Sequence, residues 1–208
     1  FRLYDSYMSE IEIRNIYYEL KGKYDTFVCT MQTTTTPNPT NGLVENDVYL
    51  PYYSESYYSG TIDWGDGTVV ENTYDNRSHT YATAGTYEIK VQGNIGWDGE
   101  YCSYSNYVHT PGGQYAPNPQ RLLEIKKWGA LVIGYATSPY YGATFRIFGN
   151  CSNMDISTTD ILDTRGILWM ANFFMNCTNL IFNESINKWD VSKVERMGQI
   201  FRNSSFNG

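Results

Sequence analysis

The chain has few of the residues on which common catalytic and cofactor sites are built. It has two histidines and four cysteines in 208 residues, and the patterns HExxH, CxxC and GxxxxGK[ST] do not occur. The usual zinc and phosphate sites therefore have no support in the sequence. Nucleophilic catalysis needs a histidine within reach of a Ser or Cys, and no such constellation is evident. We expect a protein that is not an enzyme and uses no cofactor and no metal.

Basic residues and long apolar runs are also scarce. The formal net charge is -7 and the sequence pI is about 4.8, so the chain lacks the basic face that neutralises phosphates, and we expect no nucleic-acid partner. The longest apolar stretch, residues 128–136, contains two glycines and a tyrosine, and it falls short of the roughly 18 to 20 residues that cross a bilayer. We expect no membrane insertion in this segment. The chain begins with Phe1 and has no basic start before an apolar run, so we expect a targeting signal to have been removed or to lie upstream.

Tyrosine is the residue that the chain has in excess. All 20 tyrosines lie within residues 1–141. Tyrosine combines an apolar ring with a hydroxyl that can stay in water, which suits β-structure and contact surfaces. Two groups exceed what one strand can bury on one face, and we predict them as binding residues: Tyr52, Tyr53, Tyr57, Tyr58, Tyr101, Tyr104 and Tyr107. The alternative is that the tyrosine groups, with a third around Pro139, coat a join between two domains.

Alternating apolar residues predict strands in the first half. Phe27, Cys29 and Met31 alternate with polar or smaller residues, and a second strand follows around residues 48–52. The turn former Gly65-Asp66-Gly67 between two apolar runs predicts a β-hairpin, and residues 86–92 alternate cleanly. Strands with turns every 8 to 12 residues predict an antiparallel β-sandwich over residues 26–121, with a long Tyr-rich loop and a lead-in segment at 1–25.

The same half carries three short motifs in order. They are Asp63-Trp-Gly-Asp-Gly-Thr68, His79-Thr-Tyr81 and Gly85-Thr-Tyr87. With these motifs, residues 26–95 resemble the PKD family of immunoglobulin-like β-sandwiches. The resemblance implies an extracellular spacer or binding module without catalytic activity.

The second half repeats itself. Residues 162–178 match residues 189–205 at an offset of 27, and a fainter copy lies at 144–153. In the last copy, apolar residues at positions 194, 197, 200 and 201 predict one face of a short helix, and Ser192 with Glu195 fits a capping box. The segment 180–186 predicts one strand per repeat. A strand and a helix every 26 or 27 residues predict a solenoid over residues 122–208.

These repeats have a recognisable motif, WDxSxVxxMxxMF followed by an Asn-containing turn. Residues 189–207 match it nearly throughout, with Ile200 in place of the second Met, whereas the copy at Leu162 departs more. This half resembles the BspA-like leucine-rich repeats, also called DUF285, which implies a surface protein. The fold class expected for the whole chain is mainly β with short helices. Since an open solenoid end exposes apolar surface, we expect further repeats or a capping unit after Gly208.

The individual candidate residues each have a structural interpretation. His79 lies in the second motif, where we expect it to pack in the sandwich and to hydrogen-bond the turn, and His109 is expected to be a solvated loop residue. Asp63, Asp66 and Asp98 raise the possibility of calcium, but their spacing supplies too few oxygens. We favour Asp66 as an acceptor of backbone N–H groups in its own turn.

Cysteines and glycosylation sequons leave some alternatives open. Cys151 and Cys177 occupy the same repeat position, and we expect buried, unlinked thiols. Cys29 and Cys102 either form one bridge or stay reduced. Five Asn-x-Ser/Thr sequons occur, at Asn76, Asn150, Asn176, Asn183 and Asn203. Three of them share one repeat position and are expected to satisfy backbone groups, which leaves Asn76 and Asn183 as possible glycan sites.

The sequence therefore favours a non-enzymatic adhesion or binding protein, extracellular or on a cell surface, that contacts a protein or glycan. The alternative is a structural component of a virion or extracellular filament, which self-assembles or packs with other surface proteins.

Overall fold

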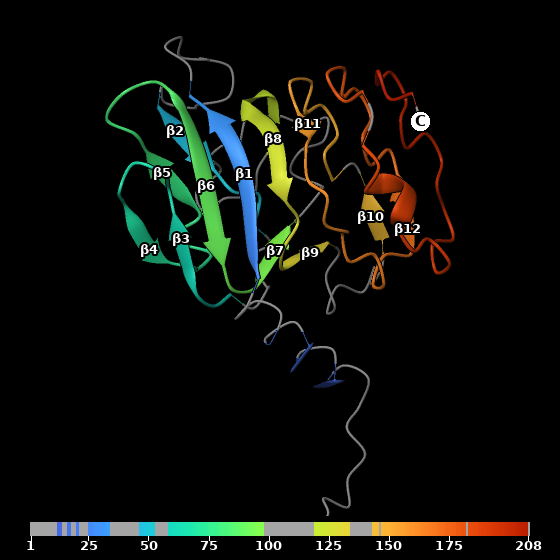
Figure 1. The fold of residues 1–208 in the computed structure, drawn as a ribbon, viewed down its shortest axis with the longest axis horizontal. Helices are drawn as coiled ribbons and strands as arrows, with labels where there is room; N and C mark the ends of the chain where they lie inside the picture. Colours follow the sequence, from blue (N-terminus) through green and yellow to red (C-terminus); the bar gives the residue numbers. More distant parts are fainter. Residues whose placement is uncertain are drawn as a thin grey trace, which may run out of the picture.

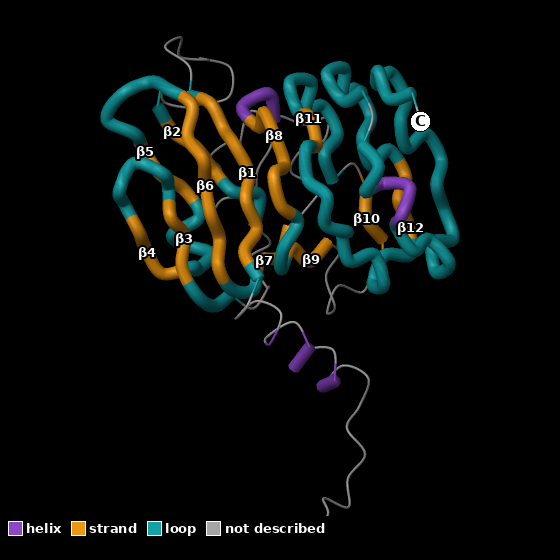
Figure 2. The backbone as a smooth tube through the Cα atoms, in the orientation of Figure 1, coloured by secondary structure: helices purple, strands orange, loops and turns teal. Residues whose placement is uncertain are grey.

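The computed structural model describes residues 12–13, 16–17, 20, 25–33, 46–52, 58–97, 119–133, 143–145, 147–181 and 183–207. These residues are mainly β, with little helix (Figures 1 and 2). The strands are β1 (Thr26–Gln32), β2 (Asp47–Tyr49), β3 (Thr61–Asp63), β4 (Val69–Glu71), β5 (Ser78–Thr80), β6 (Thr86–Gln92), β7 (Ile95–Trp97), β8 (Leu122–Lys127), β9 (Leu131–Ile133), β10 (Ala143–Phe145), β11 (Asp155–Ile156) and β12 (Trp169–Ala171). Short 3-10 helices lie at Pro119–Arg121 and Ile186–Lys188.

The largest sheet has six strands in the order β11-β8-β1-β6-β3-β4. β1 and β6 lie at its centre and pair antiparallel over their whole lengths. The alternation predicted from the sequence is confirmed there, because Phe27, Cys29 and Met31 are buried on one face. Ile89 and Val91 of β6 are fully buried as well.

The predicted hairpin is confirmed as β3 and β4. Its turn needs glycine, because Gly65 has a φ of 80° and a Cβ there would lie 2.4 Å from the carbonyl oxygen of Glu88. The Asp63 carboxylate accepts a hydrogen bond of 2.9 Å from the Gly65 N–H. The turn is therefore fixed by the short polar side chain of Asp63 and by the lack of a side chain at Gly65.

Three pairings are parallel, and each includes a strand outside residues 26–121, the range for which an antiparallel arrangement was predicted. β8 pairs in parallel with β11, β7 with β9, and β10 with β12. Each joins segments that are distant in the sequence, which short-range patterns do not reveal. The six-stranded sheet also crosses the boundary expected at residues 121 and 122, because β8 pairs with β1. The division into two domains stays a prediction.

One hydrophobic core also extends across this boundary. Trp128 is fully buried, and its ring centroid lies 5.8 Å from that of Phe148 and 5.9 Å from that of Trp189. The Asp160 carboxylate accepts the backbone N–H groups of Trp128 and Gly129 at 3.0 and 2.9 Å. These contacts lie within the second half. The halves meet where the ring of Trp97 lies 5.7 Å from that of Phe148 and its indole N–H donates to the Ile147 carbonyl at 3.4 Å.

The helix predicted in each repeat is wrong. The described residues at 191–203 form turns and a single bridge. Gln199 and Asn203 have positive φ values of 61° and 54°, which interrupt a right-handed helix. Ser192 N–H donates to Asp190 in an Asx turn and Glu195 N–H donates to Leu168, so the capping box does not form.

The strand predicted at residues 180–186 is also wrong for the residues described there. The strand of this copy is β12, inside the segment expected to be helical, and residues 186–188 form a 3-10 helix. Figure 2 shows the C-terminal half as successive turns with short strands. Within the described part of the chain, no helix has both the length and the apolarity to cross a bilayer.

Candidate functional site

The three motifs of the first half meet in one aromatic cluster. The His79 ring stacks on Trp64 at 5.2 Å and packs edge-on against Tyr81 at 4.5 Å. Tyr81 stacks on Tyr87 at 3.6 Å, and its hydroxyl donates to the Trp64 carbonyl at 2.7 Å. Burial raises the pKa of the Tyr81 hydroxyl above its usual value. This cluster joins the turn to two strands.

His79 and Asp66 form the polar edge of the cluster. Their side chains are 2.7 Å apart, and Asp66 also accepts the Thr68 N–H at 2.9 Å. Partial burial opposes ionisation of Asp66, but the hydrogen bonds from His79 and Thr68 outweigh it and lower its pKa to about 2. The predicted role of Asp66 as a turn acceptor is confirmed, and so is that of His79 in packing and bonding the turn.

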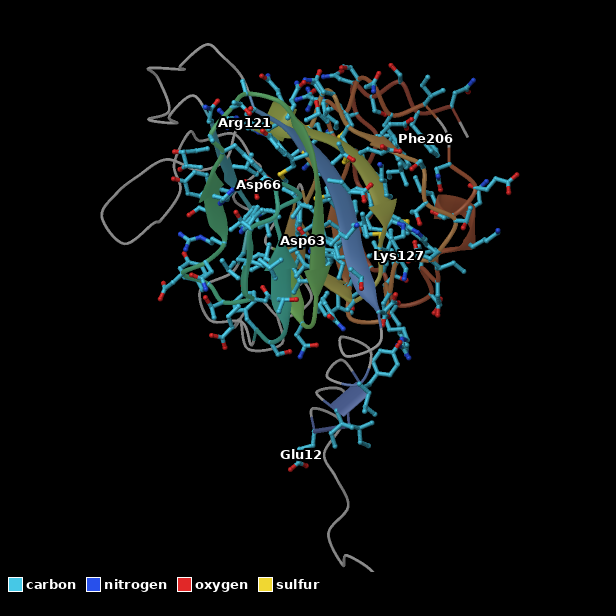
Figure 3. All side chains as sticks on the ribbon, turned by 60° about the vertical axis from the view of Figure 1, so that its left-hand side comes forward. Glu12, Asp63, Asp66, Arg121, Lys127 and Phe206 are labelled. Atoms are coloured by element: carbon cyan, nitrogen blue, oxygen red, sulfur yellow. The ribbon has the colours of Figure 1, made fainter. Side chains whose placement is uncertain are left out.

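The described contacts of His79 are to Asp66, Trp64 and Tyr81. The hydrogen bond of His79 is to a carboxylate and not to a hydroxyl or thiol of the described residues. In the same part of the chain, no group of three or more His, Cys, Asp or Glu side chains is placed to hold a metal ion. Asp63 and Asp66 lie near the β4 edge of the six-stranded sheet, away from the C-terminal repeats (Figure 3). His109 and Asp98 lie outside the described residues.

The tyrosines predicted as binding residues divide into two sets. Tyr52 is 2% exposed, so its prediction as a surface contact is wrong. Its hydroxyl donates to Asn72 at 2.8 Å, its ring stacks on half-buried Tyr58 at 4.6 Å, and burial raises the pKa of its hydroxyl. The sequence pattern did not reveal that the Tyr52 hydroxyl has a buried polar partner, Asn72. Half-buried Tyr58 stays a predicted binding residue, and the other five, Tyr53, Tyr57, Tyr101, Tyr104 and Tyr107, lie outside the described residues.

The cysteines are buried thiols where the structure describes them. Cys29, Cys151 and Cys177 are buried and in no disulfide bond, which confirms the prediction for the repeat pair. Cys102 lies outside the described residues, and since Cys29 is free, the possible bridge between them is not formed. Burial raises the pKa of the Cys29 thiol, which opposes its reaction as a thiolate.

The possible glycan site at Asn183 is wrong. Its side chain is buried, and its amide donates to the carbonyls of Ile156 and Thr158 at 2.6 and 3.1 Å. A glycan on that nitrogen would displace both hydrogen bonds. Asn76 is less buried and donates to the Glu71 carbonyl, so it stays a possible site.

The equivalent asparagines of the repeats form a ladder. The Asn176 amide donates to the side chain of Asn150 at 2.7 Å, and that of Asn203 donates to the side chain of Asn176 at 3.1 Å. The prediction of a ladder is confirmed, and the amides of Asn176 and Asn203 donate to the preceding asparagine rather than to the backbone groups expected. All three have φ values between 54° and 67°, a left-handed conformation that Asn adopts more readily than most residues.

A second set of polar residues runs along the repeats beside this ladder. Thr178 and Ser205 each donate from their hydroxyls to the carbonyl of the equivalent residue in the preceding copy, and Asn179 does the same to Asn153. Four of the five are exposed. We call this set the polar row: Ser152, Asn153, Thr178, Asn179 and Ser205. The sequence-based prediction missed it, although small polar residues recur there with the repeat period.

The row has a definite hydrogen-bonding character. The donor groups of Thr178, Asn179 and Ser205 are engaged with the preceding copy. Hydroxyl and amide oxygens keep lone pairs when their donors are used. The row therefore carries oxygen lone pairs at the spacing of the repeats.

Comparison with known proteins gives a family match for the repeats. Residues 143–208 match the family described as Mycoplasma protein of unknown function, DUF285. The repeats of this part of the chain are therefore similar to that family, as the motif predicted. The match does not reach the first half, where the PKD-like resemblance stays a prediction. No curated protein and no solved structure matches the chain.

Proposed function

We propose that this protein is a non-enzymatic binding or adhesion protein displayed outside the cell. In this proposal the first half is a PKD-like β-sandwich that acts as a spacer, and the second half is a leucine-rich-repeat solenoid that presents the contact surface. The ligand is a glycan or a protein on a cell or particle surface. The polar row is the observation that carries the proposal.

The polar row suits a ligand rich in hydroxyl or amide donors. Its oxygens recur once per copy, and the copies are joined by backbone hydrogen bonds such as Phe174 N–H to Ile200 carbonyl at 2.8 Å. Since the side chains are held by the preceding copy, little rotamer freedom is lost on binding. Several weak polar contacts at fixed spacing give useful affinity only to a ligand with a matching repeat, which favours an extended glycan or peptide.

The aromatic cluster supports the spacer role of the first half. Trp64 and Tyr81 are both 1% exposed, and His79 and Tyr87 pack against them. The cluster is thus committed to packing. Contact by the first half would come from its tyrosine-rich segments, where Tyr53, Tyr57, Tyr101, Tyr104 and Tyr107 stay proposed.

Binding of the intact chain to arrays of glycans and of extracellular proteins tests this function. The double variant Asn153→Ala and Asn179→Ala should weaken binding of any ligand found by about tenfold or more. The double variant Glu184→Ala and Lys188→Ala changes exposed residues between copies and is the matched control. An array without a ligand, or a ligand bound equally by both variants, would count against the proposal.

A structural component of a virion or filament is the second candidate. Val191 and Met197 of the last repeat are each 41% exposed, and apolar surface of this kind favours assembly. Light scattering over a range of concentrations, with electron microscopy of the product, distinguishes the candidates. Ordered particles or filaments would favour assembly, and a monomer at all concentrations would favour adhesion.

A further inference from the structure

An aromatic and a basic residue meet on the outer face of the short parallel sheet in the repeats. β10 and β12 pair in parallel, with Trp169 as the register partner of Ala143, and a parallel bridge joins Trp169 to Arg196 (Figure 1). Successive side chains of a strand point to opposite faces, so Met170, which is 1% exposed, lies on the core side. Trp169 is half-buried and Arg196 is exposed. The pair therefore lies on the face in contact with solvent.

The guanidinium of Arg196 is stacked on Trp169 and has no polar partner. Its central carbon lies 4.4 Å from the centre of the Trp169 ring. In the described part of the chain, no oxygen accepts a hydrogen bond from this guanidinium and no carboxylate pairs with it. By contrast, Arg77, Arg165 and Arg202 each donate to a carbonyl, a carboxylate or a side-chain amide oxygen. The indole thus holds the Arg196 guanidinium while its N–H groups stay open to a ligand.

A stacked guanidinium of this kind suits a carboxylate. Its five N–H donors lie in one plane and can form two parallel hydrogen bonds to the two carboxylate oxygens. Stacking on the indole restricts the long side chain, so less rotamer freedom is lost when a ligand binds. Because Arg196 has no ion pair to break, an incoming carboxylate does not have to displace a partner.

The surface beside the pair has room for a ring. Ala171 follows Trp169 by two residues and shares its face of β12, and Gly198 follows Arg196 at the same interval. A Cβ atom added at Gly198 would meet no atom within 4 Å, so the surface is open there. A sugar ring presents a flat face of C–H bonds that packs well against the negative face of an aromatic ring. The pair and the two small residues together fit a sugar ring that carries a carboxylate.

We propose that Trp169 and Arg196 form a binding site for an acidic glycan, an oligosaccharide that contains uronic acid residues. The carboxylate pairs with Arg196, and the sugar ring packs on the exposed part of Trp169 above Ala171 and Gly198. An acidic peptide also carries carboxylates, but its side chains present no flat C–H face to the indole. The site is separate from the polar row, and the proposal does not depend on a ligand of that row.

Titration of the full chain with an oligomer of galacturonic acid tests the site. We expect saturable binding by calorimetry and a shift of the Trp169 indole N–H signal in NMR spectra, assigned from its loss in Trp169→Phe. The same oligomer with methyl-esterified carboxylates should bind about tenfold more weakly or less. Absence of binding to the acid, or equal binding of the ester, would overturn the proposal. A glutamate peptide that binds as tightly as the oligomer would also overturn it, because the ligand would then be an acidic peptide.

Three variants of the full chain complete the test. Arg196→Gln removes the cation, and we expect the affinity for the oligomer to fall by about tenfold or more. Arg196→Lys keeps the charge without the planar fork and should recover only part of the loss. Arg202→Gln removes the same charge at another exposed position of the last repeat and should bind as the unchanged chain does. Equal affinity of Arg196→Gln and Arg202→Gln would overturn the proposal, and so would full recovery in Arg196→Lys, because unspecific charge attraction would then hold the ligand.

Discussion

At the scale of single residues, the Tyr81 hydroxyl holds the hairpin turn to the strand that follows it. It is buried and donates to the carbonyl of Trp64. We predict that Tyr81→Phe lowers the free energy of unfolding by about 1 to 3 kcal/mol, because the buried carbonyl loses its partner. Urea denaturation measures this change. Tyr87→Phe is the control, because its hydroxyl bonds to Thr83 at an exposed site and water can replace it, so an equal loss in both variants would contradict the prediction.

Asp66 makes the stability of the hairpin depend on acid. Its folded-state pKa of about 2 lies below the usual 3.8 of an aspartate, so its ionisation stabilises the fold above pH 4. That contribution is lost as the pH falls from about 4 to about 2. We predict that Asp66→Asn flattens the pH dependence of the unfolding free energy in this window. Glu71→Gln, an exposed carboxyl of the same hairpin, is the control, and a slope unchanged in Asp66→Asn would contradict the prediction.

Roles fixed by local sequence were predictable at this scale. Asp66 and His79 act within a turn and a motif, and the sequence places their partners nearby. The burial of Tyr52 was not predictable, because its partner Asn72 lies 20 residues away on another segment. A tyrosine-rich stretch looks the same in sequence whether its hydroxyls meet water or a buried amide.

At the scale of elements, the asparagine ladder fixes the turn of each repeat. Asn176 takes part in two side-chain hydrogen bonds, whereas Asn203 takes part in one. We predict that Asn176→Ala destabilises the chain by about 2 to 4 kcal/mol, since it also forces alanine into a left-handed conformation. Asn176→Gly should cost less, because glycine removes the strain, and Asn203→Ala should also cost less. Chemical denaturation gives the order, and equal losses for Ala and Gly at position 176 would contradict it.

The elements of the two halves were predictable to different degrees. β1, β6 and the hairpin follow from alternation, because each buries one face. In the repeats, the apolar spacing that predicted a helix is met equally by stacked turns. The positive φ at Gln199 decides between them, and Gln carries little signal for that conformation. The parallel pairing of β8 with β11 depends on the arrangement of the whole chain.

At the scale of the whole molecule, one sheet and one core connect the halves. β8 covers the edge of β1, and Trp97 of the first half lies against Phe148 of the repeats. We predict that a chain ending at Arg121 does not fold cooperatively, because the edge of β1 and its apolar face are exposed. Circular dichroism during heating and size-exclusion chromatography measure this. A chain lacking residues 1–24 is the control, and a cooperative transition in the chain ending at Arg121 would show an independent first domain.

The direction of the backbone hydrogen bonds has a consequence for how such a chain can change its length. The Met170 N–H donates to the Arg196 carbonyl of the following copy, and the Phe148 N–H donates to the Phe173 carbonyl of the copy that follows it. The two boundaries between copies are therefore chemically alike. A copy duplicated in the middle would meet acceptable neighbours on both sides, and a deleted one would leave neighbours that still fit. The length of the repeat array can therefore change in whole steps of 26 or 27 residues while the six-stranded sheet stays unaltered. The number of repeats then sets how far the array extends from the sheet.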